Sequence, residues 1–175
     1  ADKTFGYVGT ILKIDLTEST IEKVPTADYD PDLWVGGRGL GSIIQWCECG
    51  PEVGALDPEN VLTFMSGPLT GTMLDGGRTF VQAVSPTGYP DTGSFSRSSF
   101  GGGFAPEMKF AGYDGIIVKG KAPEPVYIYI NDDVVEIRKA NDLWAWTTSP
   151  CRTSCGCAAR ARRASLPSAP PAKTC

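Results

Sequence analysis

Two glycine-rich stretches contain the residues of this chain that are best suited to hold a ligand. Residues 67–78, GPLTGTMLDGGR, include four glycines and end on Arg78, and residues 98–115, SSFGGGFAPEMKFAGYDG, include three consecutive glycines. Glycine lets the backbone approach a ligand closely and adopt positive φ, and a guanidinium donates two parallel hydrogen bonds to a phosphate. We therefore predict that both stretches line one face and hold a phosphate-bearing ligand, mainly through backbone groups.

The second stretch also has the features of a helix start. After the glycine run at 101–103, Pro106 suits the first helical position, Glu107 the first turn and Gly112 the end of a short helix. A glycine loop that leads into a helix presents unpaired N–H groups to an anion. The prediction of a phosphate site is therefore stronger here than at an ordinary glycine-rich turn.

A third glycine-rich motif, GGRGLGS at 36–42, does not complete a dinucleotide fingerprint. Ser42 stands where the third glycine of that fingerprint is required, and no clear strand precedes the motif. The motif instead predicts a tight turn and close packing at the start of a helix. Arg38, inside it, suits a surface charge as well as a ligand contact, and the sequence leaves both open.

Six cysteines and the absence of histidine limit the other kinds of site. Without histidine, a Ser-His-Asp or Cys-His catalytic arrangement cannot form. Cys47 and Cys49 fall in a predicted helix and are expected to be buried thiols. The four remaining cysteines are Cys151, Cys155, Cys157 and Cys175, of which the first three form the spacing C-x3-C-x-C. This spacing matches no ferredoxin pattern, so we do not expect these cysteines to bind an iron–sulfur cluster or another metal.

The pattern of apolar residues predicts an α+β fold that is mostly β. A helix is expected at 39–49 from its helical spacing, and residues 85–98, rich in Gly, Ser and Pro, are expected to be a loop. The first strand alternates and should be half-buried. The predicted strands, of which the last two flank a hairpin turn, are 7–16, 20–24, 61–65, 79–84, 115–118, 126–130 and 134–138.

Charge and hydropathy exclude two classes of partner. The net charge of −4 divides into +5 for residues 147–175 and −9 for the rest, where 11 basic residues face 20 acidic ones. An acidic body argues against nucleic-acid binding. No apolar run approaches the roughly 18 residues of a membrane span, and the first residues lack a signal pattern, so a cytoplasmic protein is expected.

The composition changes abruptly near Trp146. Residues 147–175 are rich in Ala, Arg, Ser, Pro and Cys and contain no aromatic or acidic residue. Such a segment cannot bury enough apolar surface to offset its ordering entropy. We therefore predict a folded domain at 1–146 and a tail at 147–175 that is disordered or derives from a frameshift.

Several long segments carry a resemblance to a known family. They are GYVGTILKIDLTESTIEKV, WVGGRGLGSIIQW, LDPENVLTFMSGPLTGT, GGRTFVQAVSP and GGGFAPEMKFAGYDGIIVKGKAPEPVYIYINDDVVEIRKANDLW. Together they resemble the N-terminal domain of the aldehyde ferredoxin oxidoreductase family, tungsten enzymes that carry a bis-pyranopterin. The resemblance runs from about residue 5 to residue 144 and implies a two-sheet pterin-binding domain.

The resemblance also implies roles for individual residues. Arg78 matches the family's arginine between pterin and cluster, and Ser99, Phe100, Gly101 and Gly102 match the loop that binds the pterin phosphate. Ser99 would give a backbone carbonyl to a Mg²⁺ ion that bridges the pterin phosphates. Many members have Asn-Ser-Gly-Gly in this loop, so a side-chain contact from its first position would differ here.

The implied function is that of the cofactor-binding part of an enzyme that oxidises aldehydes to carboxylic acids. Tungsten, or molybdenum, would pass electrons through a 4Fe-4S cluster to ferredoxin or another electron-transfer subunit, in a homodimer or multi-subunit complex. Later domains supply the cluster ligands in the family, so this chain is expected to be an incomplete fragment without catalytic residues, inert alone. The alternatives are a subunit of a tungsten benzoyl-CoA reductase and a truncated, non-catalytic pterin-binding module.

Overall fold

The computed structural model describes residues 6–73, 77–87, 93–141 and 143–144. The predicted tail at 147–175, with its four cysteines, and residues 74–76 of the first glycine-rich stretch lie outside the described residues. The described elements are, in order, β1 (Thr10–Asp15), β2 (Thr20–Pro25), a 3-10 turn (Thr26–Tyr29), α1 (Pro31–Trp34), α2 (Arg38–Glu48), β3 (Val61–Met65), β4 (Thr79–Ser85), β5 (Ser94–Phe100), α3 (Phe104–Phe110), β6 (Gly115–Lys119), β7 (Val126–Asn131) and β8 (Val134–Lys139).

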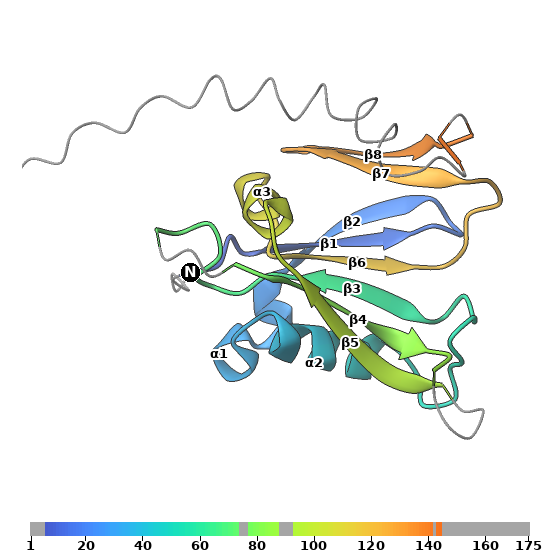
Figure 1. Cartoon of the computed structure of the whole chain (residues 1–175), viewed down its shortest axis with the longest axis horizontal. Coiled ribbons are helices and arrows are strands. Elements are labelled where there is room, and N and C mark those ends of the chain that lie inside the picture. Colours follow the sequence, from blue (N-terminus) through green and yellow to red (C-terminus); the bar gives the residue numbers. More distant parts are fainter. Residues whose placement is uncertain (1–5, 74–76, 88–92, 142, 145–175) are drawn as a thin grey trace, which may run out of the picture.

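Six strands form one sheet in the order β2-β1-β6-β3-β4-β5, and β7 and β8 form a separate hairpin (Figure 1). Strands β1 and β6 pair in parallel, and the other neighbours in the large sheet pair antiparallel. A parallel pair needs a long crossover, which here includes every element from β2 to α3. The crossover therefore carries both glycine-rich stretches.

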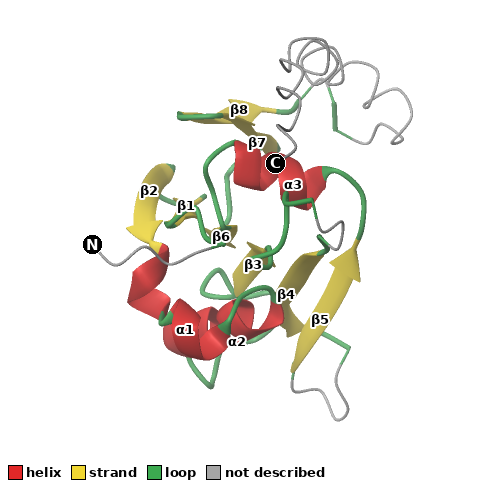
Figure 2. Cartoon of the chain, turned by 90° about the vertical axis from the view of Figure 1, so that its left-hand side faces the viewer, coloured by secondary structure: helices red, strands yellow, loops and turns green. Residues whose placement is uncertain are grey.

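The large sheet is covered on both faces (Figure 2). One face packs on α2, and the other packs on α3 and the β7–β8 hairpin. The cluster on the α2 side consists of Ile11, Leu40, Ile44, Val61, Met65 and Ile117. The cluster on the opposite side consists of Leu12, Ile14, Met108, Tyr113 and Ile116, with the hairpin residues Ile128, Ile130, Val135 and Ile137 packed against it. These two layers of apolar contact make a three-layer domain.

The covering of both faces corrects the prediction that the first strand is half-buried. Ile11, Leu12 and Ile14 are all fully buried, because Ile11 faces α2 while Leu12 and Ile14 face α3 and the hairpin. The strand is also shorter than the predicted range 7–16. The prediction of an α+β, mostly β fold is confirmed, as are α2, to within one residue at each end, and the β7–β8 hairpin.

Three other predictions were wrong in detail. Residues 94–98 belong to β5 rather than to a loop, because they pair with β4 at the edge of the sheet. Pro106 is the third residue of α3, which begins at Phe104. Cys47 is exposed, since it lies on the outer side of α2, whereas Cys49 is partly buried against the core.

Within the described ranges, the structure has no helix of the length and hydropathy that a bilayer crossing requires.

Candidate functional site

The ends of three antiparallel strands bring the two glycine-rich stretches together at one edge of the large sheet. This edge is the one formed by the strand ends, not the one formed by the outermost strand β5. Met65 at the end of β3 pairs with Phe80 near the start of β4, and Phe80 also pairs with Ser99 near the end of β5. The loop after β3, the residues before β4 and the glycine run after β5 must therefore lie at the same end (Figure 1). This arrangement places the described parts of both stretches at one end of the sheet, as the prediction of a shared face requires.

Arg78 and Ser99 touch at this edge. The Arg78 Nη1 group donates a hydrogen bond to Ser99 Oγ at 3.0 Å. The arginine is exposed and the serine is half-buried, so the hydroxyl orients the guanidinium without removing it from solvent. A charged fork held in one direction beside a backbone loop is suited to bind phosphate.

The glycine run that follows β5 has an open backbone. Apart from the glycine itself and its two neighbours in the chain, no heavy atom lies within 4 Å of the position that a Cβ would take at Gly101 or Gly102, and Gly102 has φ +94°. Two phenylalanines flank the run in the sequence. The ring of Phe100 packs edge-on against that of Phe104, with a centroid distance of 5.5 Å. Phe104 also approaches Phe64 of β3 at 6.1 Å. The aromatic contacts fix the loop to the sheet while its backbone stays accessible.

The glycines of the GGRGLGS motif serve close packing. A Cβ at Gly36 would lie 3.0 Å from Pro68 Cδ, and a Cβ at Gly39 would lie 2.0 Å from the Trp34 carbonyl oxygen. The prediction of a tight turn with close packing at 36–42 is thereby confirmed. Arg38 is exposed at the start of α2, where its backbone carbonyl accepts a hydrogen bond from the amide of Gln82 at 3.3 Å.

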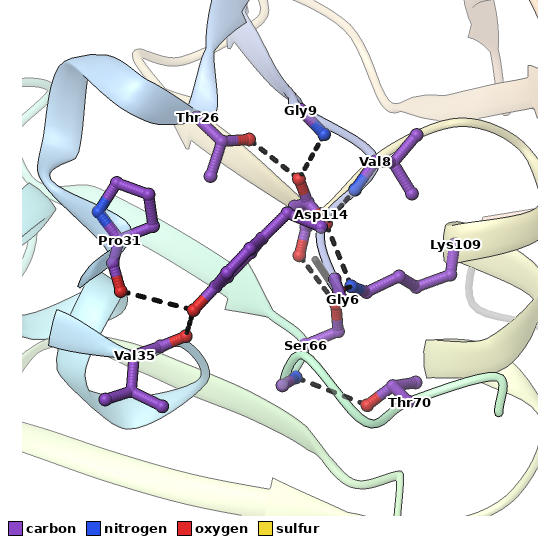
Figure 3. A network of polar contacts seen from close by, with 12 residues as sticks. Gly6, Val8, Gly9, Thr26, Pro31, Val35, Ser66, Thr70, Lys109 and Asp114 are labelled. Atoms are coloured by element: carbon purple, nitrogen blue, oxygen red, sulfur yellow. Dashed lines mark hydrogen bonds and ion pairs between the residues drawn. The ribbon is translucent and has the colours of Figure 1, made fainter. Parts of the chain in front are cut away.

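A buried polar network beside these loops was not predicted from the sequence (Figure 3). The Asp114 carboxylate, 1% exposed, forms an ion pair with Lys109 at 3.0 Å. It also accepts hydrogen bonds from the backbone N–H groups of Val8 and Gly9, at 3.0 and 2.7 Å, and from Thr26 Oγ1 at 2.7 Å. The feature of the sequence that comes closest to indicating this network is the position of Asp114, an acidic residue between the predicted end of a helix at Gly112 and a buried strand.

A second ion pair lies away from this edge. Lys13 Nζ contacts the Glu48 carboxylate at 2.7 Å, and Tyr29 donates its hydroxyl hydrogen to the same carboxylate at 3.0 Å. Burial alone would raise the pKa of Glu48, but the hydrogen bonds from Lys13 and Tyr29 and the charge of Lys13 outweigh it, so the pKa lies below its ordinary value. Burial, with the charge of Glu48, raises the pKa of Tyr29.

Side-chain metal ligands do not gather at the edge. In the part of the chain that the structure describes, no group of three or more His, Cys, Asp or Glu residues is arranged to hold a metal ion. What the edge offers is the Arg78 guanidinium, the Ser99 hydroxyl and the open backbone at Gly101 and Gly102. Carbonyl oxygens suit Mg²⁺, and a guanidinium beside an open backbone suits a phosphate, so these groups fit a phosphate with a bridging Mg²⁺.

Comparisons with known proteins relate this chain to one family of oxidoreductases. Residues 11–160 match the family described as the aldehyde ferredoxin oxidoreductase N-terminal domain. The chain is 45% identical over 141 residues to a tungsten-containing aldehyde ferredoxin oxidoreductase of Pyrococcus horikoshii, with 80% of this chain and 23% of that protein covered. It is 41% identical over 143 residues to an aliphatic sulfonate oxidoreductase, WOR-like subunit, of Pyrococcus furiosus, with 80% of this chain and 22% of that protein covered.

A solved structure extends the comparison to the fold. The active site complex BamBC of benzoyl coenzyme A reductase, in complex with 1,5-dienoyl-CoA, superposes with a TM-score of 0.74 and 45% sequence identity, covering 79% of this chain and 21% of that chain. The chain thus spans less than a quarter of the length of these relatives. Because the family match includes 150 of the 175 residues, the chain belongs to the family of the aldehyde ferredoxin oxidoreductase N-terminal domain.

Proposed function

We propose that this domain holds the phosphate-bearing part of a tungsten bis-pyranopterin in an oxidoreductase. The observation that carries the proposal is the contact of Arg78 with Ser99 beside an open glycine run. The tungsten-containing relatives, at 45% identity, support the choice of cofactor. When bound, the metal–pterin group supplies the two-electron redox chemistry, and the protein contributes binding, orientation and electrostatics.

Each residue of the proposed site has a separate task. Arg78 donates N–H groups to phosphate or pterin oxygens, and Ser99 holds the guanidinium in that direction through its 3.0 Å contact. Phe100, Gly101 and Gly102 present backbone to the phosphate, and the Ser99 carbonyl is the proposed ligand of a bridging Mg²⁺. None of these residues is proposed to be catalytic.

For the whole protein we propose the oxidation of aldehydes to carboxylic acids in the cytoplasm. Electrons would leave through a 4Fe-4S cluster, ligated outside this domain, to ferredoxin or another electron-transfer subunit, and the enzyme would act as a homodimer or multi-subunit complex. Relatives named as tungsten-containing aldehyde ferredoxin oxidoreductases favour this reaction. The benzoyl-CoA reductase neighbour favours a second candidate, a subunit that acts on an aromatic thioester. A truncated pterin-binding module without activity is the third candidate.

Substitution of Arg78 tests the proposed site. In a full-length protein that contains this domain, Arg78→Ala should weaken cofactor retention by about 10- to 150-fold, since a lost charge-assisted contact costs about 1.5–3 kcal/mol. Arg78→Lys should recover only part of the loss because the bidentate fork is gone. The measurement is tungsten and pterin content after anaerobic purification.

Arg97 provides the matched control. It is also exposed and lies on β5 two residues from Ser99, so Arg97→Ala removes the same charge from the strand that carries Ser99 and should leave the tungsten content unchanged. Full tungsten content in Arg78→Ala would contradict the proposal. Activity of the wild-type protein with aldehydes and with an aromatic acyl-CoA then separates the candidate reactions, and inactivity with both, at normal cofactor content, supports the module.

A further inference from the structure

We propose that Asp114 and Lys109 are positioning residues that hold the two glycine-rich stretches in a fixed relation to each other. This inference rests on the proposed function, because the edge that they organise is the proposed cofactor site. Neither side chain is offered as a contact to the cofactor: their side chains are 1% and 6% exposed. Their effect would pass through the segments that they join.

The pair is built as a junction of several segments. The Asp114 carboxylate binds Lys109 of α3, the backbone of Val8 and Gly9, and the hydroxyl of Thr26 after β2. A buried ion pair is often no more stabilising than an apolar replacement of similar shape. Its four directional contacts instead restrict the geometry, since each partner must occupy one place for the carboxylate to be satisfied.

One connection runs from Asp114 to the loop that follows β3. The Asp114 carbonyl accepts hydrogen bonds from Ser66 N at 3.1 Å and from Ser66 Oγ at 2.8 Å. Ser66 directly precedes the 67–72 loop, whose turn is closed by Thr70 N to the Gly67 carbonyl at 3.1 Å. Asp114 therefore sets the position at which this loop leaves the sheet.

A second connection runs from Lys109 to the same loop. Lys109 Nζ donates to the backbone carbonyl of Gly6, and Gly6 packs so closely on Pro68 that a Cβ there would lie 2.9 Å from Pro68 Cβ. Lys109 belongs to α3, which begins directly after the glycine run at 101–103. Two routes thus tie the helix behind one stretch to the loop of the other (Figure 3).

Hydrogen exchange of the 175-residue chain tests this coupling without any cofactor. Asp114→Asn keeps the shape but removes the charge, so hydrogen-bonded amides at 6–9 and 67–72, and that of Glu107, which donates to the Gly103 carbonyl at 3.0 Å, should exchange about tenfold faster or more. Ser66→Ala removes one buried hydrogen bond and leaves the ion pair intact, and it serves if Asp114→Asn does not fold. It should accelerate exchange at 67–72. Acceleration confined to 6–9 in Asp114→Asn, or none at 67–72 in Ser66→Ala, would overturn the proposal.

Glu48→Gln is the control for a general loss of stability. It breaks the Lys13–Glu48 pair and leaves in place every contact of the Asp114 and Lys109 side chains named above. In the full-length protein, Asp114→Asn and Ser66→Ala should each lower the tungsten content at least several-fold, whereas Glu48→Gln should retain it even at a comparable fall in Tm. Equal loss of tungsten in Glu48→Gln would show that stability alone is responsible and would overturn the positioning role.

Arg78→Ala, measured in parallel, separates the positioning role of Asp114 from the proposed cofactor site. A loss of tungsten in Arg78→Ala with full content in both Asp114→Asn and Ser66→Ala would overturn the positioning role and leave the proposed function standing. Full content in Arg78→Ala would overturn the proposed function itself. The exchange data on the isolated chain still decide whether Asp114 couples the stretches.

Discussion

Replacing Gly101 by alanine should separate ligand binding from stability. The position is open, with no heavy atom beyond the adjacent residues within 4 Å of the place that the alanine methyl group would take, and Gly101 does not have positive φ. In the unliganded domain the alanine therefore meets no clash, and the smaller conformational freedom of the unfolded chain should leave the free energy of unfolding unchanged or raise it by up to about 1 kcal/mol. The measurement is urea denaturation of the 175-residue chain.

With the cofactor present the same methyl group should be costly. It would occupy the side of the backbone on which we place the phosphate, and an extra methyl group in a filled space costs about 1–3 kcal/mol. That cost corresponds to a loss of affinity of about 5- to 150-fold, read as tungsten and pterin content of the full-length protein. Stability and cofactor content should thus respond differently to one substitution.

Gly112→Ala is the matched control for this experiment. Gly112 is equally open but has φ +97°, and it lies at the other end of α3. Alanine in that left-handed conformation costs about 1–2 kcal/mol, so the domain should lose stability while the cofactor is retained. Normal tungsten content in Gly101→Ala would refute the backbone cradle, and a clear loss of stability in the unliganded Gly101→Ala domain would refute the reasoning from open space.

Two further predictions concern the fold. Gly39→Ala should lower the free energy of unfolding, measured by urea denaturation, by about 2–3 kcal/mol. A Cβ at this position would lie only 2.0 Å from the Trp34 carbonyl oxygen, so the backbone would have to move. The cost of that movement exceeds the gain of about 1 kcal/mol in helix propensity. The lowered pKa of Glu48 means that its contribution to stability is complete above the ordinary value of about 4.3 and is lost as the pH falls through the lower, folded value. Glu48→Gln should therefore flatten the decline of the unfolding free energy below about pH 4, and an unchanged decline would contradict this reasoning.

The elements that the sequence predicted well are those whose pattern is local. The α2 helix follows from apolar residues at helical spacing, and the β7–β8 hairpin follows from its turn residues, one of which, Asp132, has φ +53°. Strand β5 has no such pattern. Its sequence, SFSRSSF, forms a strand because it pairs with β4 along its whole length at the edge of the sheet, a tertiary effect that overrides weak local preference.

The predicted juxtaposition of the glycine-rich stretches succeeded for a related reason. Both flank strands, and antiparallel pairing of β3, β4 and β5 leaves few ways to separate their ends. The junction at Asp114 could not be found in this way. Its partners Val8 and Thr26 lie 106 and 88 residues away in the sequence, and a single acidic residue before a strand is ordinarily read as part of a turn.

The division of tasks between side chains and backbone bears on how one domain can serve different reactions. Proteins named for aldehyde, sulfonate and benzoyl-CoA chemistry are each 41–45% identical to this chain. A phosphate-bearing cofactor that these proteins share would be a large anion. A guanidinium and an open backbone can hold such an anion, and neither of these two groups depends on the substrate. In the proposed site the contact of Arg78 with Ser99, the glycine run and the Asp114 junction would all be of this kind, because each fixes geometry at the edge of the sheet and none of them is assigned a substrate contact. We therefore expect substitutions at this edge to lower the amount of bound cofactor, with the substrate preference of the remaining loaded enzyme unchanged.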